Sequence, residues 1–400
     1  MITVAIICFF FAAIIVWLTI DYKAGRKKHL QQERYQFYPM RRSNLEFYID
    51  GHSFYNELFR AIKQSKQSVH ILFYIVKNDE ISHEFLTLLG EKAKQGVEVR
   101  LLLDYIGGKE FTDKEISLLK RKGVHFAYAN KPKWPFYFYT LQARNHRKIT
   151  VIDGEIGFLG GFNIGKEYLG HDPKLGFWRD YHLRLTNEGV TDLQQQFSKD
   201  WFKATSEDLT SNQTYFPKLL PGKLEQRFLS TNGSFLKKYF ISLIQSAKKE
   251  ILICTPYFIP GKKIQQELIK AAKRGVNVKV LVPMKADHPL VREASFPYYG
   301  PLILAGCEIY RFYHGFYHSK VFVVDDNTCD IGTANFDKRS FYINDEMNCL
   351  IYDVDFIQRV KESVYEDFTR SEKLTYEFLK KRPISERGKE LLASMISYFL

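Results

Sequence analysis

Apolar and polar positions follow two alternating patterns along the chain. A stretch with apolar residues at helical spacing is followed by a short apolar run rich in β-branched residues, and this order recurs between residues 54 and 129. The alternation of helix and strand predicts an α/β fold whose sheet contains parallel strands. The expected helices cover residues 54–64, 83–95 and 114–122, and the expected strands cover 69–76, 97–104 and 124–129.

The N-terminal apolar run differs from these segments, because Ile2–Ile20 contains no charged side chain. As a helix it would extend about 28 Å at about 1.5 Å per residue, close to the hydrocarbon thickness of a bilayer. A cleaved signal peptide would carry basic residues before its apolar run, whereas here Lys23, Arg26 and Lys27 follow it. We therefore expect an uncleaved single-pass anchor in a cell membrane, with the rest of the chain on the cytoplasmic side.

A long internal duplication organises the remaining chain. Residues 243–258 resemble residues 61–76, and residues 270–282 resemble residues 91–103. Such a period is too long for a solenoid repeat and predicts two similar halves. The predicted organisation is a transmembrane anchor (1–21), a basic juxtamembrane linker (22–43), half 1 (44–204), a polar linker (205–224) and half 2 (225–400).

The end of half 2 predicts an amphipathic helix. One face of this helix collects the apolar side chains of Leu391, Leu392, Met395, Ile396 and Phe399. We expect this face to pack on the folded half. The alternative is that it lies in a membrane interface.

Composition and charge narrow the class of protein. An apolar fraction of 45% and a charged fraction of 26% are typical of a globular protein with a full core. The net charge of +13 indicates an anionic partner, either nucleic acid or an acidic membrane surface, and the anchor favours the membrane. None of the five cysteines forms a CxxC pair, which argues against a zinc site or a disulfide framework.

A short motif that occurs once in each half carries the candidate chemistry. "NHRKITVID" contains His146, Lys148 and Asp153 in the pattern H-x-K-x4-D, and "YHSKVFVVD" repeats this pattern in half 2. One match would be weak, but two matches at equivalent places in a duplication are a strong signal. The half 2 members are His318, Lys320 and Asp325. Each motif leads at the same spacing to a turn, "GGFN" with Gly161 and Asn163 or "GTAN" with Thr333 and Asn335.

These residue types suit phosphoryl chemistry. Residues two apart on a strand point to the same side, so His146 and Lys148 share a face, as do their half 2 counterparts. A histidine ring can attack phosphorus, and an adjacent ammonium can hold the phosphate oxygens. Asp153 and Asp325, the third members of the catalytic motif, lie seven positions after its histidine. On an unbroken strand they would face away from the histidine, so we expect them to support the fold rather than to contact the phosphate. The candidate phosphate binders are the turn residues Gly161, Asn163, Thr333 and Asn335.

On these residues the chain resembles the phospholipase D superfamily, which is marked by paired H-x-K-x4-D motifs with a trailing glycine turn and asparagine. The single anchor, "RNHRKITVIDG" and "GTANFDKRSF" are similar to bacterial cardiolipin synthases of the shorter, single-anchor type. The resemblance covers residues 45–385. It implies two duplicated α/β halves with mixed sheets that share one active site.

The resemblance also implies a membrane phosphatidyltransferase. Two phosphatidylglycerol molecules would give cardiolipin and glycerol, without a metal or another cofactor, and with anionic membrane lipids rather than nucleic acid as partners. One histidine would take the phosphatidyl group as a phosphohistidine, and the other would act as acid and base. In this family the first motif usually supplies the nucleophile, so His146 is expected in that role and His318 in the other. The sequence alone does not distinguish the two histidines.

An acid is expected to orient each histidine through its other ring nitrogen. In half 2, Glu346 has the spacing that the family shows. In half 1, Lys174 stands at that spacing, so Asp180 is the expected substitute. Each acid is thus expected in the half of the histidine that it supports. Arg339 and Ser340 are candidates for the acceptor side, or for a structural turn.

Other functions remain open on the sequence alone. A hydrolase of the same superfamily would make phosphatidic acid or cut a nucleic-acid phosphodiester, and an inactive homologue would be a membrane scaffold. The anchor disfavours the nuclease, and the two intact motifs disfavour the scaffold. The aromatic and basic stretch Lys133–Tyr139 is a candidate for membrane contact, or for a buried aromatic segment.

Overall fold

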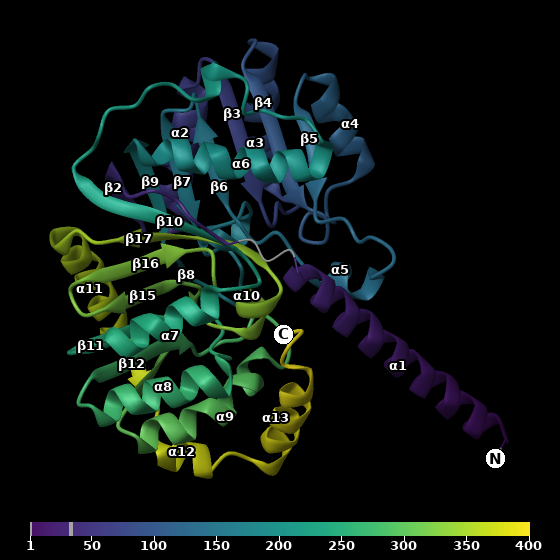
Figure 1. Ribbon diagram of the computed structural model, residues 1–400, viewed down its shortest axis with the longest axis vertical. Helices are drawn as coiled ribbons and strands as arrows, with labels where there is room; N and C mark the ends of the chain where they lie inside the picture. Colours follow the sequence, from purple (N-terminus) through teal and green to yellow (C-terminus); the bar gives the residue numbers. More distant parts are fainter. Residues whose placement is uncertain (1, 32–34) are drawn as a thin grey trace.

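A computed structural model describes residues 2–31 and 35–400, and shows two similar halves with helix α1 (Ile2–Gln31) projecting from them (Figure 1). Half 1 repeats the order of strand and helix that the sequence predicts. Its elements are β2 (Arg41–Tyr48), α2 (Gly51–Gln64), β3 (Ser68–Phe73), α3 (Glu80–Lys94), β4 (Glu98–Asp104), α4 (Asp113–Arg121), β5 (His125–Ala129), α5 (Tyr137–Gln142), β6 (Ile149–Ile152), β7 (Ile156–Gly160), the 3-10 helix η1 (Lys166–Leu169), β8 (Trp178–Arg179), β9 (His182–Asn187) and α6 (Gly189–Thr205).

Half 2 follows the same plan after a connection that contains η2 (Gln213–Tyr215). The short strand β1 (Gln36–Phe37) pairs with β10 (Leu224–Asn232), the first strand of half 2. Its elements are β10 (Leu224–Asn232), α7 (Leu236–Ser246), β11 (Glu250–Cys254), α8 (Gly261–Lys273), β12 (Asn277–Pro283), α9 (Val291–Leu304), β13 (Glu308–Phe312), β14 (Phe316–Tyr317), β15 (Val321–Val324), β16 (Thr328–Gly332), α10 (Lys338–Tyr342), β17 (Asp345–Ile351), α11 (Val354–Thr369), β18 (Ser371–Lys373), α12 (Tyr376–Lys380) and α13 (Ile384–Ile396).

One mixed sheet runs through both halves. Its strand order is β18-β13-β12-β11-β15-β16-β17-β10-β2-β9-β7-β6-β3-β4-β5. Each half contributes three neighbouring parallel strands, β3-β4-β5 in half 1 and β11-β12-β13 in half 2. The halves join where β10 pairs antiparallel with β2, with Leu224 opposite Ser43. The predicted fold class is confirmed, and the mixed sheets of the two halves are continuous.

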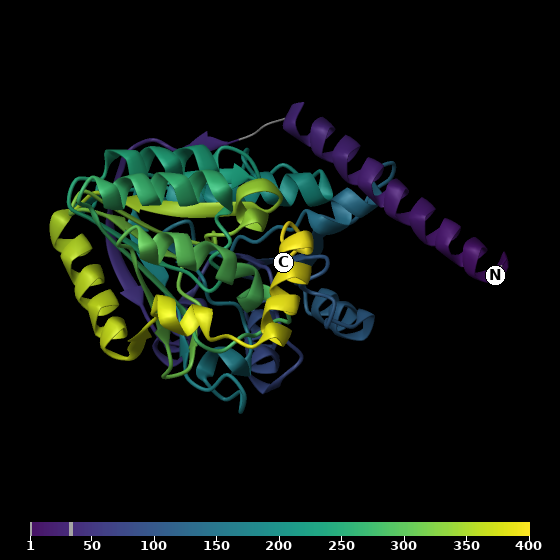
Figure 2. The ribbon, with the colours of Figure 1, turned by 90° about the horizontal axis from the view of Figure 1, so that it is seen from below.

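The central strands are apolar because helices cover both faces of the sheet. Every residue of β3 and of β11 is buried, and Figure 2 shows helices on both sides of the strands. Helix starts are fixed by side chains: Asp50 accepts a bond from the Ser53 amide, and Thr112 forms a capping box with Glu115. The six elements expected between residues 54 and 129 therefore occur close to their expected bounds.

Helix α1 is long and apolar enough to cross a membrane, with a mean hydropathy of 1.9 in its most apolar window. The segment expected as a linker, 22–43, begins within α1, which continues to Gln31, and ends within β2, which begins at Arg41. Residues 32–34 of that segment lie outside the described residues. The last turns of α1 pack on α5. Asp21 accepts a bond from the Tyr139 amide (2.8 Å), and the rings of Tyr22 and Tyr139 meet edge to face.

Helix α13 packs on half 2 as expected, but not through the expected face. Ala393 is buried in a cluster with Ala294 of α9, so the side of α13 that packs is formed by small residues. The larger apolar residues expected to pack are exposed: Leu391 by 69%, Leu392 by 52% and Met395 by 76%.

Candidate active site

The two motifs meet at the junction of the halves, where backbone bonds hold each motif to the opposite half. The His146 amide donates to the Asp345 carbonyl (2.9 Å), and the His318 amide donates to the Arg179 carbonyl (2.7 Å). Asn145 forms a parallel bridge with Asp345, and β14 pairs in parallel with β8. The same connection between halves is therefore made twice, once beside each histidine.

Each histidine is oriented by an acid from the other half. Nδ1 of His146 lies 3.1 and 3.0 Å from the two carboxylate oxygens of Glu346, and Nδ1 of His318 lies 2.6 Å from Oδ2 of Asp180. The sequence singled out both acids, but the expectation that each supports the histidine of its own half is wrong. The pairing is crossed because the residues that bind the histidine backbones directly precede the two acids.

Three residues that were candidates for substrate contact lie against these acids, and two of them donate bonds to Glu346. Thr333 Oγ1 donates to one oxygen of Glu346 (2.6 Å), and Ser340 Oγ donates to the other (2.8 Å). Gly161 makes room for Asp180, because a Cβ at position 161 would lie 2.0 Å from Asp180 Oδ1. These contacts give Thr333 and Ser340 a role in holding the acid of His146, whereas phosphate binding by Gly161 and Thr333 stays a prediction.

The motif lysines are buried beside the histidines. Lys148 Nζ donates to the His146 carbonyl (2.8 Å) and lies 5.4 Å from the centre of the Tyr74 ring. Lys320 Nζ lies 2.6 Å from Nδ1 of His318. Burial lowers the pKa of Lys148 to about 7 and that of Lys320 to about 8, because a buried ammonium loses its hydration.

Both motif histidines are neutral near pH 7. Burial lowers the pKa of His146 to about 4, although the Glu346 carboxylate opposes this shift. Burial and the Lys320 ammonium together lower the pKa of His318 to about 4. When a carboxylate holds the proton of a neutral imidazole on Nδ1, Nε2 keeps its lone pair. The arrangement at His146 is therefore that of a nucleophile or a base.

Asp153 and Asp325 tie the motif strands to their neighbours. Asp153 accepts bonds of 2.7 to 2.8 Å from the amides of residues 66–68, which lead into β3. Asp325 accepts bonds of 2.8 to 3.0 Å from the amides of residues 248–250, which lead into β11. Both aspartates have a φ of 53°, a conformation that Asp tolerates better than most residues. These contacts agree with the supporting role expected from their position on the strand.

The two asparagines line the same cavity with different partners. Asn163 Oδ1 accepts a bond from the Ile75 amide, and its Nδ2 donates to the Tyr168 hydroxyl, both at 3.1 Å. Asn335 Oδ1 is buried and has no hydrogen-bond partner among residues 2–31 and 35–400. Asn335 thus has an unused acceptor at the cavity wall, so only its Nδ2 group could donate to a phosphate oxygen, whereas the amide of Asn163 bonds to the protein at both ends.

The two histidines open into one cavity of about 710 Å³. The Tyr74 ring lies 5.0 Å from the His146 ring, and the Trp178 ring lies 4.9 Å from the His318 ring. The charged, polar and C-terminal residues that also line the cavity include Lys77, Arg144, Asn163, Lys174, Asp287, His288, Asn335, Asp337, Arg339, Phe399 and Leu400. Two histidines that open into one aromatic-walled cavity, each with a buried lysine beside it, suit an exchange at a phosphodiester.

A family model described as "Cardiolipin synthase, PLD-like domain" matches residues 58–201 and 240–368. The chain belongs to this family. The two matched segments lie in the two halves, and each includes one H-x-K-x4-D motif. Membership makes the protein an enzyme of the cardiolipin synthase type within the phospholipase D superfamily.

Curated relatives carry the same family name. The chain is 45% identical over 395 residues to "Minor cardiolipin synthase ClsB" of Bacillus subtilis (strain 168), which covers 99% of this chain and 98% of that protein. It is 37% identical over 364 residues to "Cardiolipin synthase 2" of Staphylococcus epidermidis (strain ATCC 12228 / FDA PCI 1200), which covers 90% of this chain and 75% of that protein.

Solved structures share the fold at low sequence identity. The crystal structure of a phosphatidylserine synthase from Haemophilus influenzae Rd KW20 matches with a TM-score of 0.72 and 16% identity, over 94% of this chain and 99% of that chain. A polyphosphate kinase from Porphyromonas gingivalis matches with a TM-score of 0.53 and 13% identity, over 81% of this chain and 50% of that chain. At these identities the likeness concerns the fold alone.

Sequence reasoning missed the aromatic residues that cover the histidines in this cardiolipin synthase family member. Tyr74 directly follows β3, and Tyr257 follows β11, with its ring 6.5 Å from that of His318. Trp178 precedes Asp180 by two positions. Because β3 and β11 lead into the site, an aromatic residue shortly after each of these strands was the available signal.

Proposed function

We propose that this protein is a cardiolipin synthase that transfers a phosphatidyl group from one phosphatidylglycerol to a second, giving cardiolipin and glycerol. Two crossed histidine–carboxylate pairs that face one cavity carry this proposal, because they supply two acid–base groups to one phosphodiester. The names of the relatives at 45% and 37% identity, both cardiolipin synthases, support the choice of reaction.

In the first step, Nε2 of His146 attacks the phosphorus of the donor lipid and forms a P–N bond. The bond from phosphorus to the glycerol oxygen breaks, and its electron pair stays on that oxygen. His318 supplies the proton that releases glycerol. Binding of an anionic phosphodiester raises the pKa of His318, because negative charge beside the ring favours its protonated form. Glu346 stabilises the charge that the His146 ring gains.

In the second step, the hydroxyl of another phosphatidylglycerol attacks the phosphohistidine. His318 accepts the hydroxyl proton, the P–N bond breaks, and its electron pair returns to Nε2 of His146. One phosphodiester replaces another, so the exchange balances without a nucleotide. If water attacks in place of the lipid hydroxyl, the product is phosphatidic acid.

The motif lysines and Asn335 are proposed to hold the phosphate oxygens during both steps. Lys148 and Lys320 lie next to the histidine that shares their motif, and each carries a positive charge below its lowered pKa. A buried charge stabilises a developing negative charge more strongly than an exposed one does. Asn335 adds an amide at the cavity wall.

The lipid substrate would reach the cavity from the bilayer that holds α1. Helix α1 supplies the single apolar segment expected for an anchor, and basic residues follow that segment, which favours the cytoplasmic side for both halves. Phosphatidylglycerol and other anionic lipids would then be available at the surface next to the site.

A direct assay separates this function from its alternatives. Purified full-length protein is incubated with phosphatidylglycerol vesicles, beside His146→Ala, His318→Ala and the control His83→Ala, whose parent side chain is exposed. Mass spectrometry should find cardiolipin and glycerol with the parent and the control, and neither with the two motif variants. Phosphatidic acid in place of cardiolipin would show a hydrolase, and no lipid product would refute the proposal.

A further inference from the structure

The exposed side of α13 forms an apolar patch that the fold does not cover. Leu391, Leu392 and Met395 project from this helix and are exposed by 69%, 52% and 76%. Lys389 and Arg387, in the preceding turn, are also exposed. A helix with large apolar residues on one side and basic residues nearby is typical of a segment that lies in a membrane interface.

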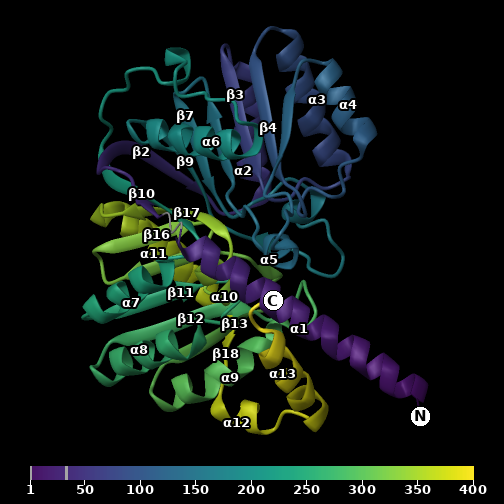
Figure 3. The same ribbon diagram turned by 45° about the vertical axis from the view of Figure 1, so that its right-hand side comes forward.

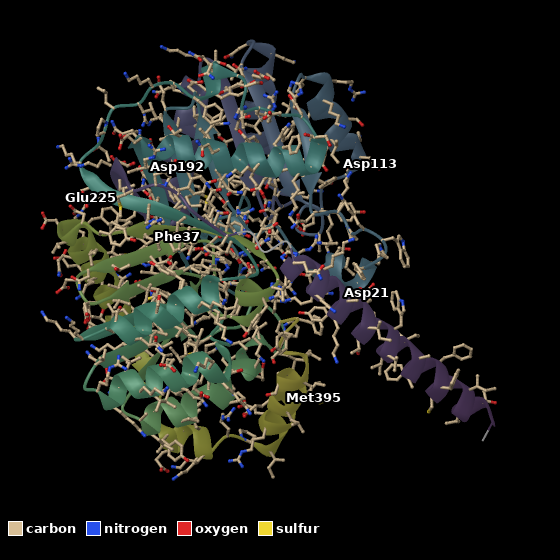
Figure 4. The ribbon with its side chains drawn as sticks, in the orientation of Figure 1. Asp21, Phe37, Asp113, Asp192, Glu225 and Met395 are labelled. Carbon is tan, nitrogen blue, oxygen red and sulfur yellow. The ribbon has the colours of Figure 1, made fainter. Side chains whose placement is uncertain are left out.

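This patch lies next to the place where α1 leaves the body. The Phe399 ring, just beyond α13, lies 5.3 Å from the Tyr22 ring of α1 and 5.6 Å from the Phe138 ring of α5. Figures 1 and 3 both place α5 and α13 on the side of the body from which α1 projects. In Figure 4, Met395 and Asp21 are labelled on this side, and Glu225 lies on the other.

An exposed aromatic pair extends the apolar surface around α1. Trp134 is exposed by 73% and stacks on Tyr137 at the start of α5, with a ring separation of 5.6 Å. Lys133 precedes this pair and is exposed. Indole rings and lysines are favoured at the level of lipid head groups. The exposed side of α13 and the pair Trp134–Tyr137 thus flank α1 near Tyr22, where the apolar run of this helix ends at Ile20.

We propose that α13 lies in the bilayer interface as a second membrane contact, with Leu391, Leu392 and Met395 inserted among the lipids. The occupant of the patch is the bilayer because the patch is continuous with the site where α1 enters it. Phe399 and Leu400, which follow α13, line the catalytic cavity. With α13 in the interface, the mouth of the cavity therefore lies against the lipid head groups. This role deepens the proposed function and rests on a lipid substrate.

Depth labelling tests the contact without relying on catalysis. A fluorescent NBD group is attached to Met395→Cys in a Cys8→Ser background, where the other four cysteines are buried. The full chain is placed in phosphatidylglycerol nanodiscs with acyl chains brominated as quenchers. The matched control is Leu220→Cys, whose parent leucine is exposed by 73% in the connection between α6 and β10. We expect at least about twofold quenching at 395 and none at 220. Equal signals at both positions would overturn the proposal.

Kinetics test the consequence for the substrate. Leu391→Glu combined with Met395→Glu should lower kcat/KM for phosphatidylglycerol vesicles about tenfold. The same variant should act normally on monomeric dihexanoyl phosphatidylglycerol, which needs no membrane. An unchanged rate on vesicles, or an equal loss on both substrates, would overturn the inference. If the parent protein acts on neither substrate, the proposed function fails, while the quenching result still decides where α13 lies.

Discussion

At the scale of single residues, the buried lysines should set the response of the site to pH. The pKa values of Lys148 and Lys320 are lowered to about 7 and about 8, so both lose their charge as the pH rises through this range. Below about pH 4, protonation of His146 removes the nucleophile. We expect kcat/KM for phosphatidylglycerol to follow a bell whose alkaline limb lies near pH 7 to 8. A profile that stays flat to about pH 10 would contradict the role of the lysines.

The motif aspartates should matter for stability more than for chemistry. Asp325→Asn weakens three bonds to backbone amides, and we expect a loss of about 2 kcal/mol in the free energy of unfolding. The amide bonds keep the folded pKa of Asp325 below its usual value against the opposing effect of burial. Their stabilisation is therefore present above the unfolded pKa and is lost as the pH falls through the folded pKa.

Thermal unfolding in detergent measures the effect of Asp325→Asn. The midpoint should fall for the variant at pH 7 and approach that of the parent at low pH. Turnover per folded molecule should stay within about threefold of the parent, because the carboxylate bonds to the start of β11 and not to a histidine. An unchanged midpoint at pH 7 would show that the three bonds add no net stability.

Single residues also mark where sequence reasoning ends. The paired motifs identified His146 and His318, and the spacing shown by the family pointed to Glu346, with Asp180 as the substitute in half 1. The crossed pairing was not predictable from spacing, because spacing describes one chain segment and not the strand beside it. The bonds from Thr333 and Ser340 to Glu346 were not predictable for a related reason: a hydroxyl near a phosphate site serves equally well to hold a carboxylate.

At the scale of elements, the turn after β7 should control the acid that supports His318. Gly161→Ala places a Cβ 2.0 Å from Asp180 Oδ1 and must displace this carboxylate. We expect turnover to fall at least about tenfold, since a misplaced acid no longer orients its histidine. Steady-state assays and circular dichroism are compared with Gly300→Ala, where the nearest side-chain atom is 3.6 Å away. Turnover of Gly161→Ala that matched this control would refute a positioning role for the glycine.

The contact between α1 and α5 should be equally sensitive to one methyl group. Gly25→Ala brings a Cβ within 2.6 Å of the Tyr139 Cβ and within 2.9 Å of the Phe136 Cβ, so α1 must move away from α5. We expect α5 to become accessible to protease in nanodiscs. Gly388→Ala is the control, because an added Cβ there has no neighbour within 4 Å in the part of the chain that the structure describes. Equal protection of α5 in both variants would contradict the close packing.

At the scale of the whole molecule, the charge pattern predicts which side of the membrane the halves occupy. Basic residues that directly follow the apolar run favour the cytoplasm. Leu220→Cys in a Cys8→Ser background should react with a membrane-impermeant maleimide in opened cells and stay unlabelled in intact cells. Labelling in intact cells would place both halves outside.

The overall organisation was largely predictable, whereas the union of the halves was not. Periodic apolar segments gave the strands and helices, and the duplication gave the two halves. The pairing of β2 with β10 joins residues far apart in sequence. Each of these strands lies at the edge of its own half, and its sequence carries no local signal for the strand with which it pairs. Similarly, the exposed side of α13 has the same sequence pattern as a packed one, because amphipathic spacing does not say which apolar surface will cover it.

The crossed contacts also have a consequence for the time course of biosynthesis. His146 and Glu346 are separated by 200 positions, a distance that takes the ribosome about 10 to 40 s at about 5–20 residues per second. During this interval α1 is already available to the membrane, while the ring of His146 has no carboxylate to orient it. With α1 as the proposed anchor, the nascent chain would be held at the membrane before His146 gains its carboxylate, and we expect activity only after Glu346 has been synthesised.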